Sequence, residues 1–472
     1  MSSSRAERGL ESRAAAWRTD VARIVPLAWP VFVGQIAVLM FATVDTVLVA
    51  RYSAVDLAAL AVGGAAYITI FIGLMGVVMA VSPIVGQLFG ARRFEAAGDQ
   101  LHQAVWLALA LTLLGSALLV FPHPFLALAR ATPEVADKVR GYLLALAFSL
   151  PAGLLFAAYR GFNTAVSRPK AVMALQLTGL ALKVPLSALL VYGAGPVPSL
   201  GVTGCGIATA MAMWFQVFVA WQVLRRDPFY KPFALFGRGL HPPHRAALIA
   251  QLKLGVPMGA SILVEVAGFA CMAFFISRIS AAAVAGHQIA ANLVTLLFML
   301  PLAIGNASST LVAQSIGAGA AHDARRVGWH GMQLAAWCAL ALGGVVFFAR
   351  EAIVRLYTGN EVIVAAALPL LAWVALFHFV DAMQIVAAFV LRAWRIATVP
   401  LVIYATSIWG LGMGGGYVLA FNVGGAVPAV LHGARGYWVA STAGIGAAAI
   451  GLTLYLFWVL RRQQRATPPA AG

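Results

Sequence analysis

Three carboxylates lie inside long apolar stretches of the sequence, where little water is available to solvate an ionised side chain. They are Asp45, Glu265 and Asp381, whereas the other Asp and Glu residues fall in loops or at the ends of apolar stretches. A charge at the centre of a bilayer costs about 2.5–3.5 kcal/mol even on insertion scales, so such residues usually carry a function. We therefore expect the chemistry of this protein to depend on these three side chains.

Two of these carboxylates are predicted to lie at one depth. Glu265 is 12 residues from Lys253 and Asp381 is 11 residues from Arg392, which places each about 17–18 Å inward at 1.5 Å per helical residue. Two carboxyls that lie close together in a medium of low dielectric repel each other as anions, so at least one would hold a proton. The deprotonated pair could instead bind Na⁺ or an organic cation. Binding of H⁺ or Na⁺ and binding of an organic cation exclude each other at this pair, so the pair predicts the exchange of one cation for another.

Asp45 is predicted to lie nearer to the outside. It is six residues from Arg51, and so about 9 Å from the outer end of its helix. A purely structural alternative exists for each acid, in which a protonated carboxyl is hydrogen-bonded between helices and only stabilises the bundle.

The composition indicates what must position these side chains. The chain has 472 residues, of which 62% are apolar and 10% charged, with a mean hydropathy of +0.90, whereas soluble chains carry about 25% charged residues. Apolar stretches of about 20 residues are long enough to cross a hydrocarbon core of about 30 Å. The sequence therefore predicts an all-α, multi-pass protein of the lipid bilayer and excludes a soluble fold. The net charge of +17 is spread over short loops, which favours an orientation signal over nucleic-acid binding.

Apolar stretches between polar, Pro or Gly positions predict twelve transmembrane helices. Their expected ranges are 24–50, 56–82, 99–121, 139–160, 170–193, 201–224, 250–277, 283–313, 327–349, 364–391, 397–421 and 437–460. Most Lys and Arg residues then fall on the side of the two termini, which the positive-inside rule makes cytoplasmic. The predicted organisation is a cytoplasmic tail (1–23), an N-lobe (24–224), a cytoplasmic linker (225–249), a C-lobe (250–460) and a cytoplasmic tail (461–472).

The two predicted lobes are related in sequence. At a constant offset of 227 residues, identical residues pair, among them Pro30 with Pro257, Arg51 with Arg278, Ser53 with Ser280, Gln87 with Gln314 and Gly90 with Gly317. This pattern indicates duplication of a six-helix unit. Parallel repeats of this kind place a substrate site near the midplane at their interface, and rocking of one half against the other opens it to either side. The architecture favours a carrier over a gated channel.

Several motifs carry a resemblance to a known family. They include PVFVGQ and VDTVLV in the first predicted helix, GVPMGASILVEV in the seventh, AGHQIAANL and FMLPLAIG in the eighth, and VDAMQ followed by LRAW in the tenth. With these motifs the chain resembles the MATE family of multidrug and toxic compound extrusion transporters, most closely its NorM-like branch. The resemblance implies twelve helices in two lobes and efflux of cationic compounds in exchange for H⁺ or Na⁺. It also implies that Asp45 is the N-lobe carboxylate, which binds substrate or a proton, and that Glu265 and Asp381 form the C-lobe cation site.

The chain departs from that branch at several places, one of them Leu311 in the segment STLVAQ, where the branch usually has an Arg. The fifth predicted helix usually carries two asparagines, but here the segment LKVPLS supplies Lys183 and Ser187. The Lys183 ammonium could take the place of a sodium ion or pair with Asp45, or it could extend to a water-filled cavity. Near Asp381, a frequent Tyr is replaced by Phe377, which keeps an aromatic face for the cavity.

We therefore predict that the protein is a secondary antiporter of the bacterial inner membrane that exports cationic, amphipathic small molecules. We expect a monomer that needs no cofactor beyond the coupling ion, H⁺ or Na⁺. The alternative is a flippase for lipid-linked oligosaccharides, which would require a cationic cavity. An intramembrane enzyme is disfavoured, since no GxGD-type aspartate pair, HExxH motif or Ser/His constellation occurs in the sequence.

Overall fold

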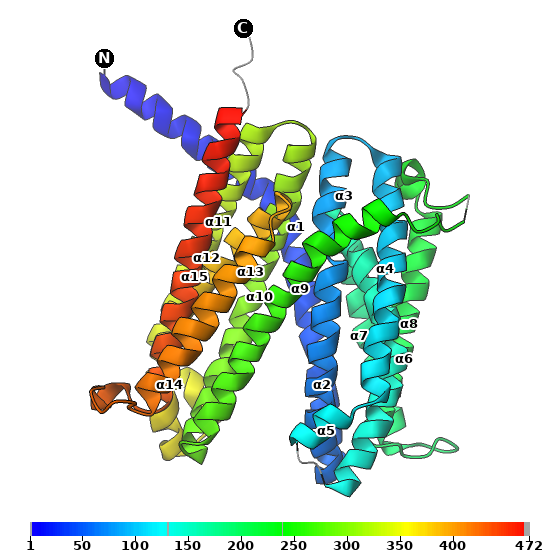
Figure 1. Ribbon diagram of the computed structural model, residues 1–472, viewed down its shortest axis with the longest axis vertical. Coiled ribbons are helices and arrows are strands. Elements are labelled where there is room, and N and C mark those ends of the chain that lie inside the picture. Colours follow the sequence, from blue (N-terminus) through cyan, green and yellow to red (C-terminus); the bar gives the residue numbers. More distant parts are fainter. Residues whose placement is uncertain (1, 130–131, 238, 467–472) are drawn as a thin grey trace. The chain divides into compact units, whose positions relative to one another are not determined.

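The computed structural model describes residues 2–129, 132–237 and 239–466, and these ranges are almost entirely helical, without a β-strand (Figure 1). Twelve of the helical segments described are long and apolar enough to cross a membrane. The predicted fold class, all-α with twelve spans, is therefore confirmed.

The chain divides into two compact units. We call Val33–Leu263 the N-terminal unit, and the chain up to Phe32 together with the chain from Val264 onward the C-terminal unit. Two long helices, α1 (Ser2–Tyr52) and α9 (Arg245–Ser277), pass from one unit to the other.

The N-terminal unit is built around α6 (Pro133–Ala165), which packs against α2, α4 and α8. Most of the apolar part of α6 is buried, as expected of a helix that is apolar on all sides. The other elements of this unit are α2 (Ala54–Val78), α3 (Val81–Gly90), α4 (Phe94–Val120), α5 (His123–Ala129), α7 (Pro169–Tyr192), α8 (Val202–Arg226) and the 3₁₀ helix η1 (Pro228–Phe233).

The C-terminal unit is built in the same way around α12 (Glu361–Ala393), which packs against α10, α11 and α15 (Figure 1). The span after α12 consists of α13 (Thr398–Tyr404), the π-helix η2 (Ala405–Gly414) and α14 (Gly415–Ala420). The remaining elements of this unit are α10 (Ala281–Gly317), α11 (Ala321–Tyr357), the 3₁₀ helix η3 (Ala429–Leu431) and α15 (Ala434–Ala466).

The duplication seen in the sequence is repeated in the local structure. Ser53 accepts a hydrogen bond from the backbone N–H of Asp56 at the start of α2, and its counterpart Ser280 accepts one from Ala283 at the start of α10. Such side chains satisfy a backbone N–H group that the first helical turn leaves without a partner. The spans Ala54–Gly90 and Ala281–Gly317 also begin and end at equivalent positions of the repeat. These correspondences support the predicted internal pseudo-symmetry.

The unit boundaries differ from the predicted lobe boundaries because they fall within α1 and α9 rather than in loops. Residues 24–32, predicted in the N-lobe, belong to the C-terminal unit, and residues 250–263, predicted in the C-lobe, belong to the N-terminal unit. Pro30 and Pro257 lie inside these two helices near the crossings. Proline removes a helical hydrogen bond and favours a bend, so the repeated proline marks where each helix changes unit.

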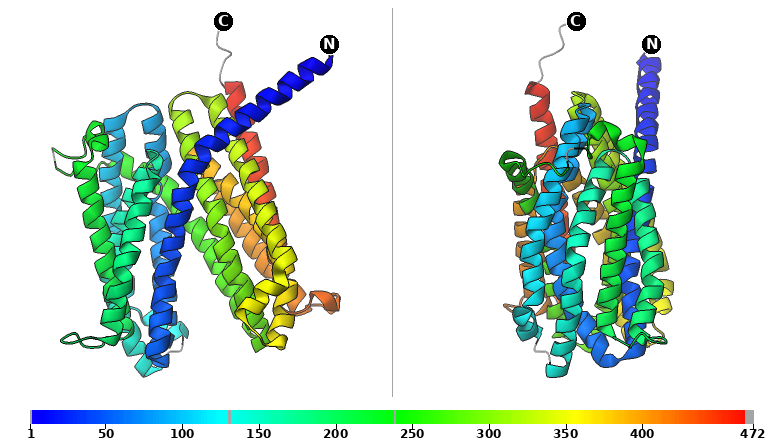
Figure 2. Two further views of the ribbon diagram at one scale, coloured as in Figure 1. Left: turned by 180° about the vertical axis from the view of Figure 1, so that it is seen from behind. Right: turned by 90° about the vertical axis from the view of Figure 1, so that its right-hand side faces the viewer.

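The ends of the predicted segments also differ from the structure. Residues 2–23 of the predicted tail 1–23 are part of α1, the blue helix of Figure 2, and residue 1 lies outside the described residues. The predicted linker 225–249 is shortened, because α8 continues to Arg226 and α9 begins at Arg245. Of the predicted tail 461–472, α15 includes residues up to Ala466, and 467–472 lie outside the described residues. The short helix α5 was not predicted.

Candidate functional site: a buried carboxylate cluster in each unit

The first cluster lies in the N-terminal unit, where α1, α7 and α8 contribute its side chains. The Lys183 ammonium lies 2.9 Å from Oδ2 of Asp45 and donates to Oγ1 of Thr209 at 2.5 Å. The Ser187 hydroxyl donates to Oδ1 of Asp45 at 3.4 Å. Lys183 and Ser187 are completely buried, and Asp45 is 6% exposed. The carboxylate thus has a partner for each oxygen.

Helix geometry explains how α7 supplies two of these partners. Lys183 and Ser187 are four residues apart, so their side chains lie above one another on one face of the helix. The Lys183 ammonium also lies 5.2 Å from the ring centroid of Phe41, which comes one turn before Asp45 on α1 and provides an additional attraction for the cation. The first helix therefore contacts Lys183 through both a carboxylate and an aromatic face.

The sequence-based candidates of this unit are all in the cluster. At 1.5 Å per helical residue, Lys183 lies about 20 Å along its helix from Lys170, and Asp45 lies about 33 Å along α1 from Arg23. The structure nevertheless brings Lys183 and Asp45 into contact. The two distances cannot be compared as depths, because Arg23 belongs to the C-terminal unit and Lys170 to the N-terminal unit.

The second cluster lies in the C-terminal unit. The side-chain amide of Gln384 in α12 donates to Oδ1 of Asp381 at 2.9 Å and to Oε1 of Glu265, in α9, at 3.3 Å. The Tyr404 hydroxyl, in α13, donates to Oε1 of Gln384. Asp381 and Gln384 are buried, whereas Glu265 is partly exposed. One amide group therefore bridges the two carboxyls that the depth count placed at the same level.

Tyr404 fixes the orientation of this bridge. A phenol hydroxyl donates to the amide oxygen, so the NH₂ group of Gln384 faces the two carboxyls. Each carboxyl oxygen can accept more than one hydrogen bond, and the cluster therefore keeps oxygen lone pairs for a proton or a small hard cation. Oxygen donors of this kind suit cations such as Na⁺.

Sequence reasoning missed three polar members of these clusters. Gln384 is part of the VDAMQ motif and lies three residues after Asp381, a spacing that places both on one helix face and could have identified it. Tyr404 is 20 residues away in another helix, and Thr209 donates to the backbone oxygen of Cys205 within α8. Neither position shows a signal in the sequence alone.

Phe377, predicted to present an aromatic face to the cavity, lies in a cluster of rings and is 2% exposed. Its ring centroid is 5.9 Å from that of Phe269 and 5.8 Å from that of Trp438, both in edge-to-face geometry. His287 packs against the same two residues. In this structure the ring is therefore surrounded by other aromatic side chains.

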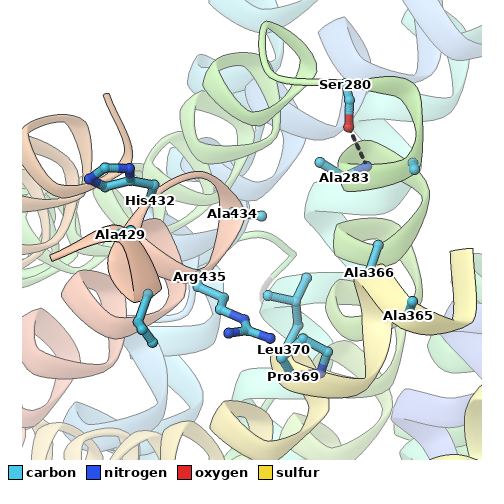
Figure 3. Close-up of a pocket in the computed structure, with 12 residues that line it drawn as sticks. Ser280, Ala283, Ala365, Ala366, Pro369, Leu370, Ala429, His432, Ala434 and Arg435 are labelled. Carbon is cyan, nitrogen blue, oxygen red and sulfur yellow. Dashed lines mark hydrogen bonds between the residues drawn. The ribbon is translucent and has the colours of Figure 1, made fainter. Parts of the chain in front are cut away.

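A separate pocket of about 280 Å³ lies between the starts of α10, α12 and α15 in the C-terminal unit (Figure 3). Ser280, Pro369, His432 and Arg435 are among the residues that line it. Pro369 precedes Asp381 by 12 residues in α12, a rise of about 18 Å. The pocket is therefore distinct from the carboxylate cluster.

Two repeated six-helix units, each with buried carboxylates, define a membrane transporter of the two-repeat class. A family model described as MatE matches residues 30–189 and again residues 257–418. The chain therefore belongs to the MatE (MATE) family and is a NorM-like transporter. The two matches begin 227 residues apart, which is the offset of the sequence repeat.

Curated relatives cover nearly the whole chain. The chain is 41% identical over 453 residues to a probable multidrug resistance protein NorM of Aromatoleum aromaticum, covering 94% of this chain and 96% of the relative. It is 33% identical to the multidrug resistance protein NorM of Vibrio cholerae, with 94% and 97% covered. The fold is similar to the crystal structure of the eukaryotic MATE transporter AtDTX14, with a TM-score of 0.84 at 18% identity, covering 96% of this chain and 98% of that one.

Proposed function

We propose that this protein is a multidrug efflux antiporter, which exports cationic, amphipathic compounds across the bacterial inner membrane in exchange for H⁺ or Na⁺. The names of its relatives support multidrug transport. The observation that carries the exchange of cations is the Gln384 amide that bridges Glu265 and Asp381.

The geometry of this bridge sets the repulsion between the Glu265 and Asp381 carboxylates, which a coupling ion would reduce. Both carboxyl oxygens accept from one nitrogen, so they are at most about 6 Å apart. Two unit charges at that distance repel by roughly 3 kcal/mol at an effective dielectric constant of 20. A single H⁺ or Na⁺ removes most of this repulsion. A cationic substrate would do the same, so the coupling ion and the substrate compete.

The N-terminal cluster has a different balance, because Lys183 already neutralises Asp45. A sodium ion would have to displace the ammonium, so we place the coupling ion at Glu265 and Asp381. Asp45, Lys183 and Ser187 then respond to substrate or to a proton, either of which separates the ion pair. A flippase for lipid-linked oligosaccharides would require a free cation to hold a phosphate, and the pairing of Lys183 with Asp45 argues against that alternative.

The repeat supports alternating access as the mechanism of transport. In parallel repeats the two halves rock about a site near the midplane, and the inward driving force on a coupling ion is about 2.3 kcal/mol per charge per 100 mV. We propose that a monomer carries out this cycle with both termini in the cytoplasm.

The proposal is tested with energised inverted membrane vesicles and ethidium as the cationic probe. If H⁺ is the coupling ion, addition of ethidium should dissipate the pH gradient reported by an internal dye. If Na⁺ is the coupling ion, ethidium transport should change when Na⁺ is varied at fixed pH. Asp381→Asn should abolish this response, whereas Glu134→Gln, at an exposed position at the start of α6, should retain it. Absence of any response to ethidium with and without Na⁺ would contradict antiport, and unchanged coupling in Asp381→Asn would exclude the assigned site.

A further inference from the structure

Two histidines and a carboxylate meet where the connection between α8 and α9 lies on α4. Asp99 and His102 belong to α4, and His241 belongs to the connection. One potential ligand atom from each residue lies within 4.8 Å of those of the other two. The His241 Nδ1 atom is 2.9 Å from Oδ1 of Asp99, and the two imidazole rings are 4.5 Å apart in edge-to-face geometry. We propose that these three residues bind a divalent transition-metal ion such as Zn²⁺.

The His102 ring is oriented so that its buried Nδ1 atom is available as a metal ligand. Its Nε2 atom lies 3.1 Å from the backbone oxygen of Leu235. A carbonyl can only accept, so Nε2 carries the hydrogen and Nδ1 presents a lone pair. His102 is only 6% exposed, and its buried Nδ1 has no hydrogen-bond partner among the described residues. Metal-bound histidines almost always donate their other N–H to a carbonyl or carboxylate in this way.

The connection that supplies His241 is firmly fastened to α4. Trp106 Nε1 donates to the His241 backbone oxygen at 2.8 Å, and Gln103 both donates to the Pro242 oxygen and accepts from the His244 backbone N–H. Gly98 permits the close approach, since a Cβ atom there would lie 2.0 Å from the Phe233 oxygen. The imidazole of His241 is therefore held beside α4 by its own backbone.

The donor set and its exposure indicate which ion would bind. Two imidazole nitrogens and one carboxylate oxygen suit Zn²⁺, which takes three or four such ligands at about 2.0–2.2 Å. The side chains of Asp99 and His241 are 39% and 31% exposed, so water can reach a fourth position. Binding would replace the hydrogen bond between these two side chains with two bonds to the metal. The bound ion would link the connection to α4, independently of the proposed antiport.

The experiment uses the full-length chain, purified in detergent without a polyhistidine tag, and Zn²⁺ alone as the probe. Calorimetry should give one ion per chain, and Co²⁺ in its place should give the visible absorption of a tetrahedral site. His241→Ala and Asp99→Asn should weaken Zn²⁺ binding at least 10-fold. Both side chains are partly exposed, so these variants should fold, which a chromatographic profile like that of the parent would establish.

The matched control is His244→Ala, because His244 lies in the same connection with an exposed side chain and contacts Gln103 only through its backbone. This variant should bind Zn²⁺ like the parent. Failure of the parent to bind Zn²⁺ would overturn the proposal. Equal weakening in His244→Ala would also overturn it, since binding would then be shared among surface histidines.

Discussion

The Lys183 ammonium of α7 lies 2.9 Å from the Asp45 carboxylate of α1, although 138 positions separate the two residues in the chain. Their side chains are 0% and 8% exposed. Burial of such a pair desolvates two charges, and good geometry with further hydrogen bonds is required to compensate. Thr209 and Ser187 supply these bonds. The balance between the cost of desolvation and the gain from the ion pair and its hydrogen bonds is therefore sensitive to any change in the charge of Lys183 or Asp45.

Removal of one member of this pair should destabilise the protein more than removal of both. Lys183→Met leaves a buried carboxylate without its cation, and we expect a loss of about 3–5 kcal/mol in the free energy of unfolding. In Asp45→Asn/Lys183→Met neither charge remains, so the loss should be smaller than that of Lys183→Met alone. Denaturant unfolding in detergent measures both values.

The control for this comparison is Lys231→Met, since Lys231 is exposed in η1. It should leave the free energy of unfolding within about 0.5 kcal/mol of the parent. Equal losses in the single and the double variant at Asp45 and Lys183 would show that the ion pair is not coupled.

The Gln384 bridge should control the affinity for the coupling ion. Gln384→Leu removes the donor to Glu265 and Asp381 and the acceptor of Tyr404. Outer partners that orient ligand groups typically contribute 10–100-fold to ion affinity, so we expect the concentration of H⁺ or Na⁺ that half-saturates transport to rise by about that factor. Transport of ethidium into inverted vesicles at varied ion concentration measures it.

Tyr404→Phe should give a smaller shift in the same direction, because it keeps both bonds from the amide to the carboxyls and only releases the amide oxygen. An unchanged ion dependence in Gln384→Leu would show that the bridge has no part in coupling.

Gly201 should be intolerant of a side chain because of Asp56. Its φ is +56°, and a Cβ atom would lie 2.2 Å from Oδ1 of Asp56. This oxygen accepts from the Val202 backbone N–H at 2.9 Å, and the other carboxylate oxygen, Oδ2, lies 2.9 Å from the Lys138 ammonium. Gly201→Ala therefore combines a positive-φ backbone that favours glycine, costing about 1–3 kcal/mol, with a steric conflict. We expect its melting temperature to fall clearly.

Gly195→Ala separates these two effects. Its φ is +57°, but nothing lies within 4 Å of the added Cβ, so only the cost of the positive φ applies, about 1–3 kcal/mol. If both variants lose the same stability, the contact with Asp56 contributes nothing.

Asp227 should make the stability of the loop after α8 dependent on pH. The Phe229 backbone N–H donates to it at 2.9 Å and Arg168 at 2.5 Å, and these bonds hold the pKa of Asp227 below its usual range. A carboxyl whose pKa is lowered by folding stabilises the protein above its unfolded pKa of about 3.9, and this contribution is lost as the pH falls through the folded value.

The melting temperature of the parent should therefore decrease more steeply below about pH 4 than that of Asp227→Asn. Arg168→Gln should give an intermediate slope, because the Phe229 N–H remains. Parallel pH profiles of parent and Asp227→Asn would show that the carboxylate does not contribute.

The sequence alone determined the class of the fold and the residues of interest. The length and apolar composition of each stretch predicted twelve spans, because crossing a bilayer requires a set number of helical residues. The constant offset between Ser53 and Ser280 revealed the repeat, and the rarity of charge in apolar stretches selected Asp45, Glu265 and Asp381. These properties depend only on the composition of single segments and on the spacing of residues along the chain, so the sequence alone is enough to detect them.

Only the tertiary structure decided which side chains meet. The contact of Lys183 with Asp45, the bridge from Gln384 to Tyr404 and the approach of His241 to His102 each join different elements. The position of the unit boundaries inside α1 and α9 was decided in the same way. Helix tilt and lateral position follow from packing between segments distant in the chain, and no local pattern of residues encodes that packing.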